Sequence, residues 1–278
     1  MQKLIQSITQ RLSTHYEAGE SRALALLLCS ELFGWRTAQI YAGYEATLTA
    51  EEMARLEAVV QRLCRYEPVQ HILGYADFAG HRFRVSGDVL IPRPETAELV
   101  EHIRQTQPQP RRVLDIGTGS GCIAIALSLA WPMAEVEAWD VSSAALEVAR
   151  TNNSDLGASV RFRLHDVFQT PPAETQGYDL WVSNPPYITE SERKDMEPNV
   201  LLWEPATALF VPDDEPLRYY RRIAELGLMG LRPGGRLWLE INRAYAEPLV
   251  CLLRELGYTD VRRMDDSFQN PRFVTACR

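Results

Sequence analysis

The stretch Val113-Leu114-Asp115-Ile116-Gly117-Thr118-Gly119-Ser120-Gly121 decides the fold class. An apolar strand runs directly into a glycine-rich turn, and a helical pattern extends from the turn to Leu129. Glycines at such a turn let the backbone approach a ligand closely. The spacing is Gly-x-Gly-x-Gly rather than Gly-x-Gly-x-x-Gly, and the acidic Asp115 precedes it. Both features disfavour a dinucleotide pyrophosphate as the ligand.

Strand and helix patterns alternate on both sides of this stretch. The helix before it is expected to begin at Pro94, because proline suits the first turn of a helix. Alternation of this kind predicts an α/β fold, a mostly parallel Rossmann-like sheet covered by helices, with ligands at the carboxyl ends of the strands. A Pro-Gly-Gly turn at 233–235 is expected before one of the later strands. The further predicted strands are Val136–Trp139, Val160–Leu164, Leu180–Val182, Leu237–Ile241, Val261–Met264 and Phe273–Ala276.

The first 75 residues have a different, helical pattern. One helix is expected over Ser21–Phe33 and ends at Gly34. Thr49 and Glu52 fit a capping box for a second helix that runs towards Pro68. We therefore predict three parts: a helical substrate-docking domain at 1–75, a hairpin linker at 76–93 and a cofactor-binding catalytic domain at 94–278.

Composition limits the partners of the chain. It has 278 residues, of which 46% are apolar and 24% charged, and a formal net charge of −8. An acidic protein gains little binding affinity from the phosphate backbones of nucleic acids, so we expect no stable nucleic-acid binding. The longest apolar run is far too short to cross a bilayer, and we expect a cytoplasmic monomer with no membrane contact. The five cysteines lack zinc-binding spacing, so no metal is predicted.

Acidic and aromatic residues at successive strand ends predict an S-adenosylmethionine site. Asp115 suits the positive amino and sulfonium groups, and Asp140, at the end of the next strand, can accept both ribose hydroxyls. After the third strand, Asp166 could bond the adenine and Phe168 could stack on it. The cofactor-binding residues predicted from these motifs are Asp115, Gly117, Thr118, Gly119, Ser120, Gly121, Asp140, Asp166 and Phe168.

The turn Asn184-Pro185-Pro186-Tyr187 leaves the fourth strand and supplies the predicted catalytic residues. Two prolines remove two backbone donors, so the Pro185 carbonyl and the Asn184 side chain can face a pocket. A site of acceptors selects a substrate NH₂ group. Both hydrogens of a planar amide or amine can be accepted, and the nitrogen is then aimed at the methyl carbon while Tyr187 packs over the plane.

Taken in order, these motifs resemble class I methyltransferases that modify exocyclic or amide nitrogens. Glu67–Gly74 and Val89–Thr96, behind a helical domain, resemble more narrowly the protein-(glutamine-N5) methyltransferases of peptide chain release factors, the PrmC/HemK family. The resemblance implies S-adenosylmethionine as cofactor, release factors as partners in translation termination, and a Gly-Gly-Gln glutamine held by Asn184 to Tyr187. It also implies that Asn184 is a cofactor-binding residue, as are Gly117 to Gly121, Asp140 and Phe168. Asn242 stands where glycine is expected, and Ala97 where a second acidic residue is expected. Neither departure is expected to touch the chemistry, although Asn242 could alter the far wall of the pocket.

Three other functions fit part of this pattern. A glutamine methyltransferase of a ribosomal protein would share every catalytic motif. An adenine-N6 or guanine-N2 nucleic-acid methyltransferase would also use an Asn-Pro-Pro-Tyr turn, with a flipped base in the pocket. The acidic balance and the lack of a basic recognition segment disfavour it. A non-catalytic cofactor-binding scaffold would have no need of the intact turn.

Overall fold

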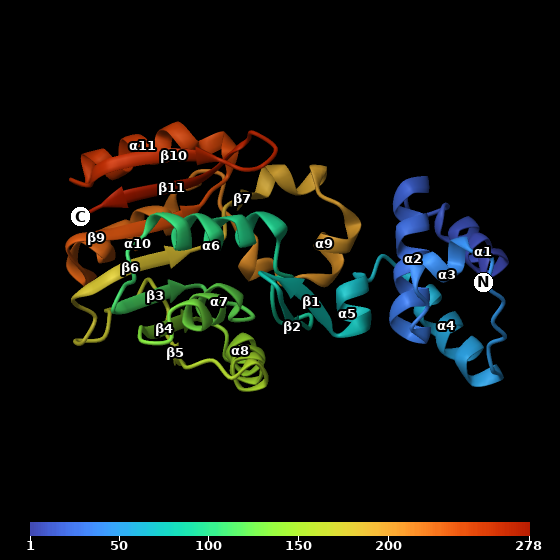
Figure 1. Cartoon of the computed structure of the whole chain (residues 1–278). Helices are drawn as coiled ribbons and strands as arrows, with labels where there is room; N and C mark the ends of the chain where they lie inside the picture. Colours follow the sequence, from blue (N-terminus) through green and yellow to red (C-terminus); the bar gives the residue numbers. More distant parts are fainter. The chain divides into compact units, whose positions relative to one another are not determined.

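A computed structural model describes all residues from Met1 to Arg278 (Figure 1). The chain divides into two compact units. The first contains Met1–Gly74 together with the short segment Glu197–Trp203, and the second contains Tyr75–Met196 and Glu204–Arg278. No helix in the structure is long and apolar enough to span a membrane. No group of three or more His, Cys, Asp or Glu side chains could hold a metal ion.

The first unit is a helical bundle around one apolar core. Helix α2 ends at Gly34, which adopts the left-handed conformation at φ 67°, and Thr49 and Glu52 form the predicted capping box of α4. Both sequence predictions are confirmed, although α2 begins three residues earlier than expected. The helices are α1 (Gln2–Leu12), α2 (Ala18–Phe33), α3 (Thr37–Tyr41), α4 (Ala50–Leu63) and α5 (Val69–Leu73).

A segment from late in the chain completes this unit. Helix α9 (Pro198–Trp203) clusters with the N-terminal helices rather than with the sheet. The Trp203 indole Nε1–H donates to the carbonyl of Arg65 at 3.2 Å. The sequence pattern did not predict this excursion, because six residues are too few to show helical periodicity.

The second unit begins with the predicted hairpin, β1 (Tyr75–Phe78) and β2 (His81–Arg84). The Arg84 N–H donates to Asn152 Oδ1 at 2.7 Å, and Asn152 Nδ2 donates to the carbonyls of Arg84 and Ser120. Asn152 lies on α8 (Ser143–Leu156). One buried amide therefore joins the hairpin to the glycine-rich turn.

Seven strands form the central sheet in the order β10-β11-β9-β6-β3-β4-β5. The five strands from β9 to β5 are parallel, and β11 pairs antiparallel with β9 and β10. The predicted α/β class and mostly parallel sheet are confirmed. The strands are β3 (Arg112–Ile116), β4 (Glu135–Asp140), β5 (Val160–Leu164), β6 (Tyr178–Ser183), β9 (Leu231–Glu240), β10 (Thr259–Asp265) and β11 (Pro271–Cys277). A second, small parallel pair joins β7 (Ile188–Thr189) to β8 (Phe210–Val211).

The Pro-Gly-Gly turn expected at 233–235 lies inside β9. Leu231 pairs with Tyr178, but Arg236 already pairs with Leu180, so the extra residues bulge out of the ladder. Gly234 adopts φ 79°, a backbone conformation that favours glycine. The turn chemistry was predicted correctly, and its placement outside the strand was wrong.

Side chains alternate across the sheet and build two cores. Val136 and Ala138 pack with residues of α6 (Pro94–Thr106), α7 (Cys122–Ala130) and α8, whereas Trp139 packs in the opposite layer. That layer contains α10 (Arg218–Gly230) and α11 (Ala246–Glu255) (Figure 1). The chain between β5 and β6 forms no helix. Glu137 of β4 instead bonds side chains of β5 and β6 in a polar cluster, described below.

Candidate active site

The glycine-rich turn joins β3 to α7 at the carboxyl edge of the sheet. Gly117, Gly119 and Gly121 have φ angles of 73°, 55° and 82°, which side chains rarely adopt. A Cβ atom at Gly119 would meet nothing within 4 Å, so this part of the backbone is open. A Cβ at Gly121 would lie 2.9 Å from Ile125 Cδ1 and 3.1 Å from Ala149 Cβ. The first glycines thus leave backbone open to a ligand, and the last allows α7 and α8 to pack closely.

Asp115 is completely buried beneath this turn. Its Oδ2 accepts from the Thr118 hydroxyl at 2.6 Å and from the Ala124 N–H at 3.2 Å, which shapes the turn and the start of α7. Burial raises the pKa of the Asp115 carboxyl to about 7. Its other oxygen, Oδ1, has no hydrogen-bond partner in the protein. A buried acceptor without a donor fits a ligand that brings a positive ammonium group.

Asp140 ends the neighbouring strand β4 and is bonded to the same turn. Its Oδ2 accepts from the Gly119 N–H and its Oδ1 from the Ser142 N–H, both at 2.8 Å. The Trp139 carbonyl accepts from the N–H groups of Gly117 and Thr118. The first two predicted cofactor motifs are therefore brought together, although the folded chain already uses both oxygens of Asp140 once.

The third motif follows β5, the strand next to β4. Asp166 Oδ1 accepts from the Phe168 N–H at 2.9 Å and so forms a tight local turn. The Phe168 ring is 36% exposed, meets Tyr219 edge to face at 5.1 Å, and lies under the Arg218 guanidinium at 4.6 Å. A half-open aromatic face fits the predicted stacking role. The backbone turn, rather than a free carboxylate, is the structural role that the geometry gives to Asp166.

The Asn184-Pro185-Pro186-Tyr187 turn leaves β6, the other neighbour of β3. Ser183 anchors its start, because its hydroxyl donates to the Ile116 carbonyl at 2.6 Å. Asn184 Nδ2 donates to Thr96 Oγ1 at 3.1 Å. Neither Asn184 Oδ1 nor the Pro185 carbonyl accepts a hydrogen bond from the protein. The two acceptors that the sequence predicted for a substrate NH₂ group are both uncommitted.

Thr96 and Glu240, whose roles the sequence did not predict, hold this turn. Glu240, at the carboxyl end of β9, is 1% exposed. Its Oε2 accepts from the Thr96 hydroxyl at 2.6 Å and its Oε1 from the Tyr187 hydroxyl at 3.2 Å. Burial raises the pKa of Glu240, and burial together with the Glu240 charge raises the pKa of Tyr187. An acidic residue at the end of an apolar strand was the available signal, because a buried carboxylate requires donors.

Asn242 also contacts the turn, which fits the expected change in the wall of the pocket, and the expectation that it does not touch the chemistry stays a prediction. Its Nδ2 donates to the Tyr187 carbonyl at 3.2 Å and to both carboxylate oxygens of Glu192. Its Oδ1 accepts from the Ala244 N–H. Glycine has no side chain to make these bonds. The other departure, Ala97, only packs against the core on α6.

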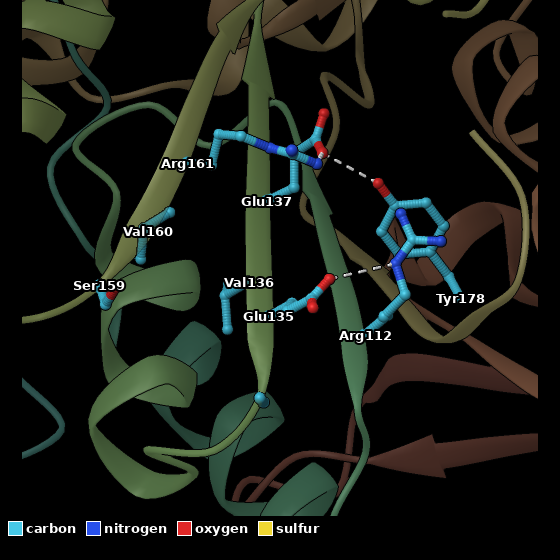
Figure 2. Close-up of a pocket in the computed structure, with 9 residues that line it drawn as sticks. Arg112, Glu135, Val136, Glu137, Ser159, Val160, Arg161 and Tyr178 are labelled. Atoms are coloured by element: carbon cyan, nitrogen blue, oxygen red, sulfur yellow. Dashed lines mark hydrogen bonds and ion pairs between the residues drawn. The ribbon is translucent and has the colours of Figure 1, made fainter. Parts of the chain in front are cut away.

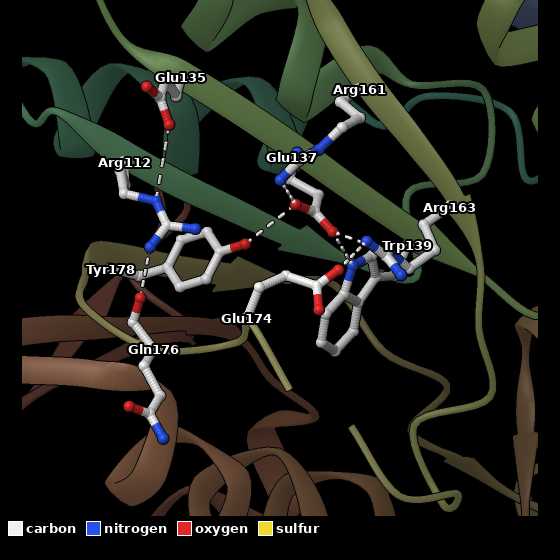
Figure 3. Close-up of polar contacts among 9 residues, drawn as sticks. All are labelled: Arg112, Glu135, Glu137, Trp139, Arg161, Arg163, Glu174, Gln176 and Tyr178. Carbon is white, nitrogen blue, oxygen red and sulfur yellow. Dashed lines mark hydrogen bonds and ion pairs between the residues drawn. The ribbon is translucent and has the colours of Figure 1, made fainter. Parts of the chain in front are cut away.

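A pocket lies at the opposite edge of the sheet, where the parallel strands begin (Figure 2). It is not the cofactor site, because its polar groups are already paired (Figure 3). Glu137 accepts from Trp139 Nε1 at 2.7 Å, from the Tyr178 hydroxyl at 3.0 Å, and from the guanidinium groups of Arg161 and Arg163. Burial opposes the ionisation of Glu137, but these bonds outweigh it and its pKa is lowered.

Comparison with known proteins identifies the family. The release factor glutamine methyltransferase of Bacteroides thetaiotaomicron is 50% identical over 278 residues, which is 100% of both chains. The chain belongs to the release factor glutamine methyltransferase family. The same-named protein of Koribacter versatilis is 37% identical over 94% of this chain and 93% of its own. The family models "PrmC N-terminal domain" and "Methyltransferase small domain" match residues 3–74 and 94–209.

Solved structures support the fold alone. A methyltransferase from Pyrococcus furiosus is 15% identical, with a TM-score of 0.53, over 82% of this chain and 98% of its own. The catalytic domain of hMettl16 is 19% identical, with a TM-score of 0.53, over 84% and 83%. Family membership makes this member an S-adenosylmethionine-dependent methyltransferase. The open glycine turn and the unpartnered Asp115 oxygen fit that cofactor.

Proposed function

We propose that this enzyme methylates the side-chain amide N5 of the glutamine in the Gly-Gly-Gln loop of peptide chain release factors. The pair of uncommitted acceptors, Asn184 Oδ1 and the Pro185 carbonyl, carries the proposal. A primary amide has two N–H donors on one planar nitrogen, which matches two acceptors at one turn. The release factor glutamine methyltransferases that are similar to this chain support the choice of acceptor.

Methyl transfer to an amide nitrogen depends mainly on how the amide is oriented against the methyl group. S-adenosylmethionine supplies an electrophilic methyl group on sulfur, held at the glycine turn and Asp140. Asn184 Oδ1 and the Pro185 carbonyl each accept one N–H of the substrate amide, and this fixes its plane against the methyl group. Transfer would form the new N–C bond at the expense of the S–C bond of the donor, and the nitrogen would release one proton to solvent. An amide nitrogen is a poor nucleophile, so correct placement of its face contributes most of the acceleration.

The first structural unit is proposed as the docking module for the release factor. The match of 3–74 to the PrmC N-terminal domain supports this division. The chain also sends Glu197–Trp203 into that unit shortly after the Asn184 turn and returns at Glu204. Such an acceptor supports the proposal that the enzyme acts in the cytoplasm, where release factors are found. The monomeric state and the absence of stable nucleic-acid binding stay predictions.

The test is single-turnover transfer of labelled methyl from saturating cofactor to a purified release factor. The wild-type enzyme is expected to label the Gly-Gly-Gln glutamine, and a glutamine-to-glutamate acceptor is expected to take no label. Asn184→Ala should lower the transfer rate by about 10²- to 10³-fold, as for the loss of one preorganised group in an active site. A short Gly-Gly-Gln peptide should react more slowly than the whole release factor if the first unit docks it.

Asp140→Ala is the matched control at the cofactor end. It should weaken cofactor binding by about 1.5 to 3 kcal/mol, because charge-assisted hydrogen bonds are lost. Asn184→Ala should change that affinity much less in the same calorimeter. Transfer by Asn184→Ala within a few-fold of wild type would contradict the acceptor role. Label on a ribosomal protein or a nucleic acid, with none on a release factor, would contradict the proposed substrate.

A further inference from the structure

We infer that Glu240 and Thr96 are positioning residues that decide which edge of the Asn184 amide faces the methyl acceptor. The inference rests on the proposed function. It concerns residues outside the Asn-Pro-Pro-Tyr turn: Thr96 lies in the first turn of α6, and Glu240 ends β9. Both side chains are buried, and the hydroxyl of Thr96 lies between the Asn184 amide and the Glu240 carboxylate.

The side-chain amide of asparagine is nearly symmetric in shape. Its oxygen and nitrogen have almost the same shape, so a half-turn of the side chain exchanges an acceptor for a donor. Only the orientation with Oδ1 towards the substrate can accept an N–H. The opposite orientation would present Nδ2–H₂ to a substrate NH₂ group, donor against donor. Something in the protein must therefore set this orientation.

Glu240 sets it through Thr96. An ionised carboxylate has no hydrogen to donate, whereas a hydroxyl has one hydrogen and two lone pairs. The only hydrogen of the Thr96 hydroxyl goes to Glu240 Oε2 at 2.6 Å. Its lone pairs remain for Asn184, which must offer Nδ2, and does so at 3.1 Å. Because Glu240 can only accept, the Thr96 hydroxyl must donate to it and accept from Asn184 Nδ2. Asn184 Oδ1 is then left free for the substrate.

The surroundings hold this chain of bonds in one state. The second oxygen of Glu240 accepts from the Tyr187 hydroxyl, so the carboxylate holds both ends of the turn. Arg272, the nearby cation, donates instead to Asp266 at 3.2 Å. Thr96 is 3% exposed, so its hydroxyl is shielded from solvent. The Glu240 carboxylate is therefore bonded by two neutral hydroxyls, those of Thr96 and Tyr187, and not by a guanidinium group.

The first experiment measures turnover in near-isosteric variants. Glu240→Gln can offer Thr96 a donor, and Thr96→Val deletes the hydroxyl; each is expected to lower kcat by about 10- to 100-fold, less than loss of a contacting group. Thr96→Ser keeps the hydroxyl and should retain most of the wild-type kcat. The double variant should lose no more than the worse single variant, since both break one relay. Cofactor affinity, measured by calorimetry, should stay close to wild type throughout.

Glu137→Gln is the matched control, because Glu137 is also a buried strand glutamate that accepts from a tyrosine hydroxyl. Its kcat per folded molecule should remain near wild type. The inference is overturned if Thr96→Val, folded and able to bind cofactor, keeps wild-type kcat. It is equally overturned if Glu240→Gln loses no more kcat than Glu137→Gln.

A second readout needs no acceptor protein and separates this inference from the proposed function. The Asn184 side-chain N–H₂ resonances, assigned by their loss in Asn184→Ala, should show slow hydrogen exchange for the proton bonded to Thr96. That protection should disappear in Thr96→Val and persist in Thr96→Ser. Protection that survives in Thr96→Val would exclude the relay even if release factors are methylated. Loss of protection as expected would support the relay even if the true acceptor is another amide.

Discussion

Two buried glutamates of the same sheet have opposite surroundings. Glu137, near the start of β4, lies on the α10 and α11 face and accepts from two guanidinium groups, an indole N–H and a hydroxyl. Glu240, at the end of β9, lies on the α6 face and accepts from two hydroxyls only. The pKa of Glu137 is lowered, although burial opposes it, and burial raises the pKa of Glu240.

The difference shows how similar residues serve stability or function. Glu137 has donors on both oxygens, and they join it to side chains of β4, β5 and β6 in one polar cluster (Figure 3). Nothing in that cluster is left over for a ligand. Glu240 makes fewer and weaker bonds, and each partner it holds, Thr96 or Tyr187, belongs to or contacts the catalytic turn. Burying a charge with only neutral donors around it costs folding free energy, and such a cost is typical of functional sites.

The largest expected effect is on stability, at Glu137. Glu137→Gln removes the charge that faces Arg161 and Arg163 and places an N–H₂ group among donors. The free energy of unfolding should fall by about 2 to 4 kcal/mol, a range reduced because Arg161 can reach water. Urea unfolding followed by circular dichroism measures it. A Glu240→Gln variant that loses as much stability as Glu137→Gln would remove the contrast between the two sites.

A pair of tyrosine variants sharpens the comparison, since each glutamate accepts from one tyrosine hydroxyl. Tyr178→Phe should cost about 1 kcal/mol of stability, because Glu137 keeps three other donors, and should leave kcat unchanged. Tyr187→Phe should cost no more stability but lower kcat about tenfold, because Glu240 loses one of only two donors. Unfolding curves and single-turnover rates on both variants measure the split. Equal kcat values in the two variants would count against a functional role for Glu240.

Much of the fold could be predicted because it depends on local pattern. The β5 strand has the predicted bounds, and the glycine turn and the Asn-Pro-Pro-Tyr turn lie at adjacent strand ends, as parallel alternation requires. Their assignment to the cofactor and the acceptor stays a prediction. Helix α9 escaped prediction because its place depends on packing with residues far away in the chain.

The missed part of the site is a matter of tertiary hydrogen bonding. Thr96 and Glu240 are 144 residues apart, and neither has a local pattern that marks it as a partner of Asn184. The role of Asn242 could not be predicted from sequence for the same reason. It was judged by its difference from an expected glycine, whereas its effect depends on the Tyr187 carbonyl and Glu192, which only the fold brings within reach.

The smallest expected effect is a pH dependence of opposite sign at the two glutamates. Glu137 has a lowered pKa, so the unfolded chain binds its proton more tightly. The stability that Glu137 contributes is present above the unfolded pKa and is lost as pH falls through its folded pKa. Glu240 has a raised pKa, so its contribution is present below the unfolded pKa and is lost as pH rises through its folded pKa.

The difference in unfolding free energy between wild type and each Gln variant isolates these contributions. As pH falls below about 4.5, the advantage of wild type over Glu137→Gln should shrink. As pH falls from 7 towards 4.5, the advantage of wild type over Glu240→Gln should grow. Each slope is bounded by about 1.4 kcal/mol per pH unit, the value for one proton. Arg272 and Glu95 also act on Glu240, so both variants need the same salt and buffer. Slopes of the same sign would mean that the two carboxylates share one kind of environment, and Glu240 would then lose its distinction from a structural charge.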